Sequence, residues 1–342
     1  MLQLRIEAIK WELPDAATFF LKETSGKRVT YQAGQFLTLV FTHRDVEIRR
    51  SYSLSSSPED TLLAITVKRQ TNGEISRFML TKLKVGNILN AVEPAGRFTV
   101  NDYRSEKDIF FFAGGSGITP VFSQIKHIMR HPGNSKLILV YSSATGSVLF
   151  KDELDHLAED HPERLQIHYF ISSKGKRLNN LLVEQLVKQN SYFNIDKAEF
   201  YICGPFTFMR MVRLTLLYTG IDPNSIRKEN FVIETVPVAG NLVNYPPGNV
   251  KIHFKGEIHD IAVGENQSIL QAALQNKLAI PYSCRVGACS ACSAICKSGK
   301  VLMSANEVLT DEDIARGWVL TCTGHPVGDD VVIVYTGPPE TC

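Results

Sequence analysis

The fold is decided by one stretch of the chain, Pro281-Tyr282-Ser283-Cys284-Arg285-Val286-Gly287-Ala288-Cys289-Ser290-Ala291-Cys292. Cys322 follows after 29 further residues, so the spacing is C-x4-C-x2-C and then a distant fourth cysteine. This is the spacing of plant-type [2Fe–2S] sites, in which four thiolates hold two irons. Glycine, alanine and serine between the cysteines are small enough for the loop to wrap closely around such a cluster.

Three other interpretations of these cysteines compete with the iron–sulfur one. A zinc site also takes four ligands, but zinc modules usually carry two C-x2-C pairs, and this chain has one. Disulfides need an oxidising compartment, for which the sequence has no signal, and free structural thiols would fall on this spacing only by chance. Cys296 does not fit the spacing and is interpreted as a non-ligand. The motif favours a [2Fe–2S] cluster held by Cys284, Cys289, Cys292 and Cys322.

Length and charge narrow the class of protein. The 342 residues are enough for two or three domains. A net charge of +2 without a dense Lys/Arg run argues against a nucleic-acid partner. Residues 1–7 carry charges where a signal peptide would be apolar, and no apolar run approaches the roughly 20 residues of a membrane helix. We expect a cytoplasmic protein without membrane insertion, in a compartment that keeps thiols reduced.

Residues 1–101 are predicted to form a small antiparallel β-barrel. Short β-type runs, such as residues 36–41 and 63–68, alternate there with Gly and Pro turn signals. The segment Arg50-Ser51-Tyr52-Ser53 offers a cation, an aromatic plane and a hydroxyl, with Arg50 and Tyr52 on one face of a strand. A guanidinium suits a phosphate, and a phenol ring can stack on a flat heterocycle. Taken alone, the segment can equally be an ordinary strand face.

A second segment of this region suggests an anion site. Gly73-Glu74-Ile75-Ser76 leads into a predicted short helix over residues 77–83. The free N–H groups at the start of a helix can receive a pyrophosphate. The plainer interpretation is an ordinary helix that begins after a glycine.

Residues 102–233 are predicted to form a doubly wound parallel α/β domain. Buried-type strands alternate with segments of helical periodicity along the whole region. The predicted strands are 108–113, 137–141, 165–171 and 199–203, and the predicted helices are 121–129, 152–157, 178–187 and 206–217. In such sheets ligands bind at the carboxyl ends of the strands.

Two of these strand ends carry residues suited to a dinucleotide. The first strand runs into Gly114-Gly115-Ser116-Gly117-Ile118-Thr119-Pro120, which is Gly-rich but is not the G-x-G-x-x-G fingerprint. The last predicted strand ends in Cys203-Gly204-Pro205, a small side chain and a tight turn on which a flat ring can rest. The competing interpretation of Cys203 is a buried structural cysteine.

In this order, the segments resemble the ferredoxin–NADP reductase superfamily, and the resemblance covers nearly the whole chain. It implies that Arg50 binds the flavin phosphate, that Tyr52 stacks on the isoalloxazine and that Ser53 hydrogen-bonds near its N5. It implies further flavin contacts at Val67, Lys68, Gly73, Ile75 and Ser76. It implies a nicotinamide-dinucleotide site at Gly115, Gly117, Thr119, Pro120, Cys203, Gly204 and Pro205, with Cys203 beside the nicotinamide C4 and joining Tyr52 and Ser53 as catalytic residues. Glu229-Asn230-Phe231 resembles the end of the reductase module.

The order of the modules resembles most closely the phenylacetyl-CoA epoxidase reductase subunit and related oxygenase reductases. It implies a flavin domain over 1–101, a nucleotide domain over 102–233, a linker over 234–249 and a β-grasp ferredoxin domain over 250–342. Residues 94–98 resemble the FAD-using members more than the FMN-using ones. The segment after the second strand, residues 141–146, lacks the arginine of many NADP-binding members, so NADH and NADPH both stay open.

The combination implies an electron path. A nicotinamide delivers two electrons as hydride and an iron–sulfur cluster accepts one, so a flavin between them resolves the mismatch. The resemblance implies an NAD(P)H-dependent oxidoreductase that reduces a partner oxygenase or hydroxylase through FAD and [2Fe–2S]. The alternatives are a reductase of another redox protein, such as a hybrid-cluster protein, and a redox sensor or carrier without turnover.

Overall fold

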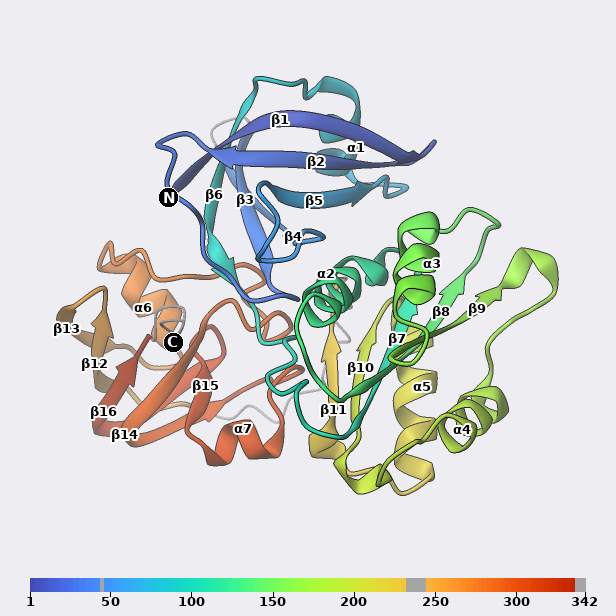
Figure 1. The fold of residues 1–342 in the computed structure, drawn as a ribbon. Coiled ribbons are helices and arrows are strands. Elements are labelled where there is room, and N and C mark those ends of the chain that lie inside the picture. Colours follow the sequence, from blue (N-terminus) through green and yellow to red (C-terminus); the bar gives the residue numbers. More distant parts are fainter. Residues whose placement is uncertain (44–45, 232–243, 336–342) are drawn as a thin grey trace. The chain divides into compact units, whose positions relative to one another are not determined.

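The computed structural model describes residues 1–43, 46–231 and 244–335, and the chain divides into two units, Met1–Phe231 and Val232–Cys342 (Figure 1). The first unit begins with an antiparallel sheet in the order β4-β3-β6-β1-β2-β5. An isolated bridge between Leu54, just after β4, and Ile65 of β5 joins the two ends of this order and closes it as a barrel. Its strands are β1 (Leu2–Leu13), β2 (Ala16–Glu23), β3 (Phe36–His43), β4 (Val46–Ser53), β5 (Leu63–Lys68) and β6 (Ile88–Ala95), and α1 (Glu74–Lys82) follows β5.

A parallel five-stranded sheet forms the rest of the first unit, in the order β11-β10-β7-β8-β9. Alternate residues of β7 face opposite sides: Phe111 packs with α2 and α3, and Phe110 and Phe112 pack with α4 and α5. Helices therefore cover both faces, as expected for a doubly wound sheet (Figure 1). The strands are β7 (Asp108–Gly114), β8 (Lys136–Ser143), β9 (Leu165–Ile171), β10 (Glu199–Cys203) and β11 (Ile226–Glu229), and the helices are α2 (Ile118–Met129), α3 (Lys151–Asp160), α4 (Asn180–Gln189) and α5 (Phe206–Tyr218).

The second unit is a mixed five-stranded sheet in the order β13-β12-β16-β14-β15. β12 and β16 run parallel, and the other pairs are antiparallel. α6 packs its buried Ile269, Leu270 and Ala273 against the sheet core. The elements are β12 (Gly248–Phe254), β13 (Glu257–Val263), α6 (Ile269–Gln275), β14 (Ser293–Met303), α7 (Asp311–Ala315), β15 (Trp318–Leu320) and β16 (Gly324–Val334).

The predicted fold class is confirmed: a barrel, a doubly wound sheet and a mixed α+β sheet follow one another along the chain. The predicted strands 63–68, 165–171 and 199–203 coincide with β5, β9 and β10. The structure adds β11, which the sequence analysis did not predict, and α1 begins at Glu74, three residues earlier than expected. The domain boundaries at 101 and 233 stay predictions, and residues 232–243 of the expected linker lie outside the described residues.

Candidate functional site

The two Gly-rich loops meet where the strand order of the parallel sheet reverses, between β7 and β10. A Cβ added to Gly117 would lie 2.2 Å from the carbonyl oxygen of Cys203, and one on Gly204 would lie 2.9 Å from the Cα of Gly114. The two backbones therefore approach as only glycine allows. Gly115 differs, because its φ is +56° and an added Cβ would meet nothing within 4 Å. The crossing loops leave open space beside Gly115, which fits a ligand bound at the switch point of the sheet.

Ser53, Cys203 and Glu229 form a buried polar cluster at this place. β10 and β11 pair in parallel with Cys203 opposite Glu229, and Ser53 at the end of β4 donates a hydrogen bond from Oγ to Glu229 Oε2 at 3.0 Å. All three residues are at most 6% exposed. One flavin-barrel strand and two strands of the parallel sheet thus supply the cluster, which brings two of the predicted catalytic residues, Ser53 and Cys203, to one carboxyl group.

Burial keeps this cluster protonated. Burial raises the pKa of Glu229 to about 8, although the Ser53 hydroxyl that donates to the carboxyl lowers it. Burial, followed by the nearby Glu229, also raises the pKa of the Cys203 thiol. Near neutral pH the cluster therefore holds a thiol and a largely protonated carboxyl, and it can hold a proton without a buried charge.

The predicted flavin segment lies on β4, where its residues pair with β3. Arg50 is opposite Leu39 and Tyr52 is opposite Leu37, so the two side chains share one face as expected. Arg50 is exposed and donates to the carbonyl oxygen of Arg49 at 2.8 Å, which leaves further guanidinium N–H groups for an anion. Burial raises the pKa of Tyr52 to about 12, so its phenol stays neutral.

The remaining predicted flavin positions lie on β5 and at the start of α1. The side chain of Val67 is fully buried in the barrel core, so only its backbone is available to a ligand, and Lys68 lies 3.7 Å from Asp15. Ser76 holds the preceding turn: its hydroxyl donates to the carbonyl oxygen of Gly73 and accepts from the backbone N–H of Gln70. No side chain caps the N-terminus of α1 at Gly73, which keeps that end suited to an anion. Ile75 is buried beneath it.

The loop after β7 is held by its own residues. Thr119 donates from Oγ1 to the carbonyl oxygen of Ser116 at 3.0 Å, and the hydroxyl of Tyr141 donates to the carbonyl oxygen of Gly115 at 3.2 Å. Pro120 is buried in the first turn of α2, where a missing N–H costs nothing. Pro205 takes the equivalent place before α5.

The four predicted cluster cysteines lie together in the second unit. The backbone N–H groups of Val286 and Ala288 point at the Sγ of Cys284 at 3.5 and 3.3 Å, and the N–H of Cys284 points at the Sγ of Cys289 at 3.4 Å. Donors aimed at sulfur are what a thiolate ligand requires. The pKa of Cys284 lies well below its ordinary value, because Cys289, then Cys322, and then these backbone groups donate to it.

The spacing of the four sulfurs, all in the described part of the chain, fits two irons better than one zinc. No three of these four atoms lie within 4.8 Å of one another. A single zinc with bonds of about 2.3 Å would hold all its sulfurs roughly 4 Å apart. Cys296 lies apart on β14, where its thiol donates to the carbonyl oxygen of Ser298 at 3.2 Å.

Comparison with known proteins agrees with this architecture. The sequence matches the family models of an oxidoreductase FAD-binding domain over residues 4–100, an oxidoreductase NAD-binding domain over 111–214 and a 2Fe-2S iron-sulfur cluster binding domain over 252–327. It is 31% identical to the ferredoxin reductase component of 3-ketosteroid-9-alpha-monooxygenase of Rhodococcus rhodochrous, over 97% of this chain and 96% of that protein. The chain belongs to the ferredoxin reductase family.

Other ferredoxin reductase relatives match over the same length. A component of the 1,2-phenylacetyl-CoA epoxidase from Escherichia coli is 28% identical over 97% of both chains. The structure of phthalate dioxygenase reductase shares the fold, with a TM-score of 0.59, 23% identity and 98% of each chain covered. The predicted resemblance, the oxidoreductase class and the FAD, NAD and [2Fe–2S] domains are confirmed. None of the helices in the described residues is long and apolar enough to span a membrane.

Glu229 is the residue to which the sequence analysis gave no role. The resemblance at Glu229-Asn230-Phe231 marked the end of the reductase module, but nothing in the sequence showed what the carboxyl group meets. Its place depends on the pairing of β11 with β10 and on a hydrogen bond to a residue 176 positions earlier. The signal that could have found it is a lone glutamate at the end of a short β-type run.

Proposed function

We propose that this ferredoxin reductase is the reductase component of an oxygenase system, with the residues predicted from the sequence as its binding and catalytic groups. The observation that carries the proposal is the meeting of Ser53, Cys203 and Glu229. The flavin barrel contributes the first residue, and the switch point of the dinucleotide sheet contributes the other two. A hydride transfer needs donor and acceptor in contact, so the two sites must meet at one point, and these residues mark it.

Each proposed group has a task that follows from its surroundings. Arg50 is the anion-binding cation of the flavin segment, and the neutral ring of Tyr52 is its stacking surface. The backbone at Gly115, Gly117 and Gly204 makes room for the dinucleotide. The thiol of Cys203 lines the hydride path without charge, and Ser53 and Glu229 hold a proton beside it.

The bound groups supply the redox chemistry: FAD accepts a hydride and releases single electrons, and the [2Fe–2S] cluster carries one electron at a time. The role of the second unit is to hold that cluster with Cys284, Cys289, Cys292 and Cys322. Its backbone N–H groups stabilise the thiolate charge. The six described cysteines are unpaired, as ligation requires, and this supports a cytoplasmic location.

The proposed partner is an oxygenase because the relatives are named as reductase parts of such systems. The printed names include a 3-ketosteroid-9-alpha-monooxygenase, a glycine betaine monooxygenase and a 1,2-phenylacetyl-CoA epoxidase. These substrates share little chemistry, which fits a reductase that meets the oxygenase and never the organic substrate. Partner recognition then belongs to the protein surface, and the terminal substrate to the partner.

The proposal is tested by rapid anaerobic mixing of the purified holoprotein with NADH and, separately, with NADPH. We expect one dinucleotide to bleach the flavin absorbance first and to reduce the cluster afterwards, seen as a new paramagnetic signal. Cytochrome c then serves as a surrogate acceptor. A Cys289→Ser variant should keep flavin bleaching and lose the cluster signal. Absence of flavin bleaching with both dinucleotides would contradict the proposal and favour the sensor or carrier alternative.

A further inference from the structure

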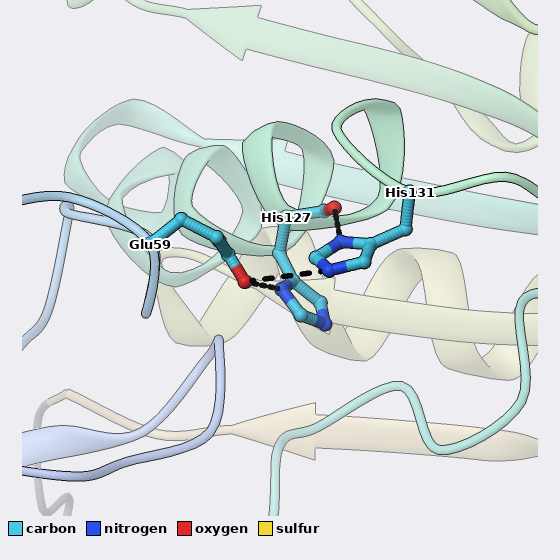
Figure 2. A group of neighbouring side chains, drawn as sticks. All are labelled: Glu59, His127 and His131. Atoms are coloured by element: carbon cyan, nitrogen blue, oxygen red, sulfur yellow. Dashed lines mark hydrogen bonds and ion pairs between the residues drawn. The ribbon is translucent and has the colours of Figure 1, made fainter.

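A second metal-ligating group lies in the first unit, away from the four cysteines. Glu59 lies in the loop between β4 and β5, His127 in the last turn of α2 and His131 just beyond that helix. One ligand atom from each of the three lies within 4.8 Å of the other two. Figure 2 shows the Glu59 carboxyl facing both imidazole rings, which come from one end of the helix (Figure 2). We propose that Glu59, His127 and His131 bind a divalent first-row metal ion, zinc in the first instance, at the seam between the flavin barrel and the dinucleotide sheet.

The hydrogen bond of His131 fixes the tautomer that a metal needs. Its Nδ1 lies 2.7 Å from the carbonyl oxygen of His127, and a carbonyl oxygen can only accept, so Nδ1 carries the proton. The neutral ring then has its lone pair on Nε2, which lies 3.7 Å from Glu59 Oε1. A lone pair facing a carboxylate is repulsive unless a proton or a cation lies between them. Metal-binding histidines commonly donate their other ring N–H in this way.

The distances also suit a small ion. Nδ1 of His127 lies 2.8 Å from Glu59 Oε1, and Nε2 of His131 lies 3.7 Å from the same oxygen. Zinc with bonds of about 2.0–2.1 Å holds neighbouring ligand atoms roughly 3.3–3.4 Å apart. The two observed separations lie on either side of that value. Two imidazoles and one carboxylate are a ligand set that zinc accepts, with a fourth position left for water.

The surrounding charges leave Glu59 to the histidines. Asp60 takes the two cations of the neighbouring helical turns, Lys126 at 2.7 Å and Arg130 at 2.6 Å. Those cations are therefore paired, and they oppose a bound metal less. Burial lowers the pKa of His127 although Glu59 raises it, so its ring is neutral and keeps a lone pair for coordination.

Binding is tested by equilibrium dialysis of the cluster-loaded holoprotein against micromolar zinc chloride, followed by elemental analysis of zinc and iron. Wild type should bind one more zinc ion per chain than His131→Gln, and Glu59→Gln should weaken binding at least as much as a lost supporting hydrogen bond, about 10–100-fold. The iron content must stay constant, which shows that zinc has not displaced the cluster. The matched control is His156→Gln, since His156 also lies 3.5 Å from a glutamate, Glu159, but belongs to no group of three ligands among the described residues.

A second readout separates the site from adventitious binding. Zinc should raise the thermal unfolding midpoint of the first unit in wild type and in His156→Gln, because an ion held across the seam stabilises the folded state only. It should leave the midpoints of His131→Gln and Glu59→Gln unchanged. Equal zinc content in wild type and His131→Gln, or an equal shift of the midpoint in both, would overturn the proposal. This test does not depend on the electron path.

Discussion

Replacement of Glu229 by glutamine tests the buried cluster most directly. The carboxyl is 6% exposed, its ordinary pKa is 4.5, and burial raises its pKa in the folded chain to about 8. The folded chain therefore keeps a proton on Glu229 that the unfolded chain releases between these two values. Stability from the protonated carboxyl is fully present below pH 4.5 and is lost as the pH rises through 8.

The size of this effect follows from the shift. A difference of about 3.5 pKa units at about 1.4 kcal/mol each corresponds to roughly 5 kcal/mol between the two ends of the pH range. Glutamine keeps the shape and can still accept the hydrogen bond from Ser53, but it cannot ionise. Glu229→Gln should therefore match wild type near pH 4.5 and should exceed its stability by up to about 5 kcal/mol above pH 8.

The assay is unfolding of the holoprotein by urea at a series of pH values, followed by the release of flavin fluorescence. The quantity of interest is the difference in unfolding free energy between Glu229→Gln and wild type, which cancels the titration of all other groups. Glu163→Gln, on an exposed turn before β9, controls for the loss of a carboxylate in general. If wild type and Glu229→Gln keep parallel profiles from pH 5 to 9, Glu229 is not a neutral buried acid and the reasoning fails.

Other predictions concern the loops and the cluster. Gly117→Ala should abolish dinucleotide reduction of the flavin or fold poorly, because its Cβ would clash with the Cys203 carbonyl oxygen, whereas Gly115→Ala meets no atom and should act on dinucleotide affinity alone; steady-state kinetics and melting compare the two. Cys203→Ala should slow flavin reduction in rapid mixing while both chromophores remain bound, and an unchanged rate would remove the thiol from the hydride path. Cys296→Ser should keep its iron in elemental analysis, since its thiol donates to carbonyl oxygens of its own strand; loss of iron would make it a ligand. Arg50→Ala should weaken FAD retention about tenfold or more in ultrafiltration, as loss of a charged hydrogen bond implies.

The sequence predicted what is local and missed what depends on pairing at long range. The strand ends at Gly114 and Cys203 could be found because apolar runs and glycines are adjacent in sequence. That the loops after them touch depends on the neighbouring places of β7 and β10, which no spacing reveals. The edge strand that carries Glu229 has only four residues, too few for a periodic signal. The Glu59, His127 and His131 group was missed for the same reason, since its members come from two distant segments of the chain.

The polar contacts of residues 53–60 explain why the first unit and the second are built differently. This segment follows the flavin strand directly, and it bonds to the dinucleotide half at several points: Ser53 to Glu229, Ser56 through its carbonyl oxygen to Ser123, and Asp60 to Lys126 and Arg130. A hydride passes only between atoms in contact, so a flavin strand and a dinucleotide sheet must be fixed to within a fraction of an ångström. A single electron has no such requirement, and the cluster cysteines accordingly belong to a separate unit of the chain. The seam is thus where the geometry of the reaction is set, and substitutions there should impair flavin reduction more than transfer to the cluster.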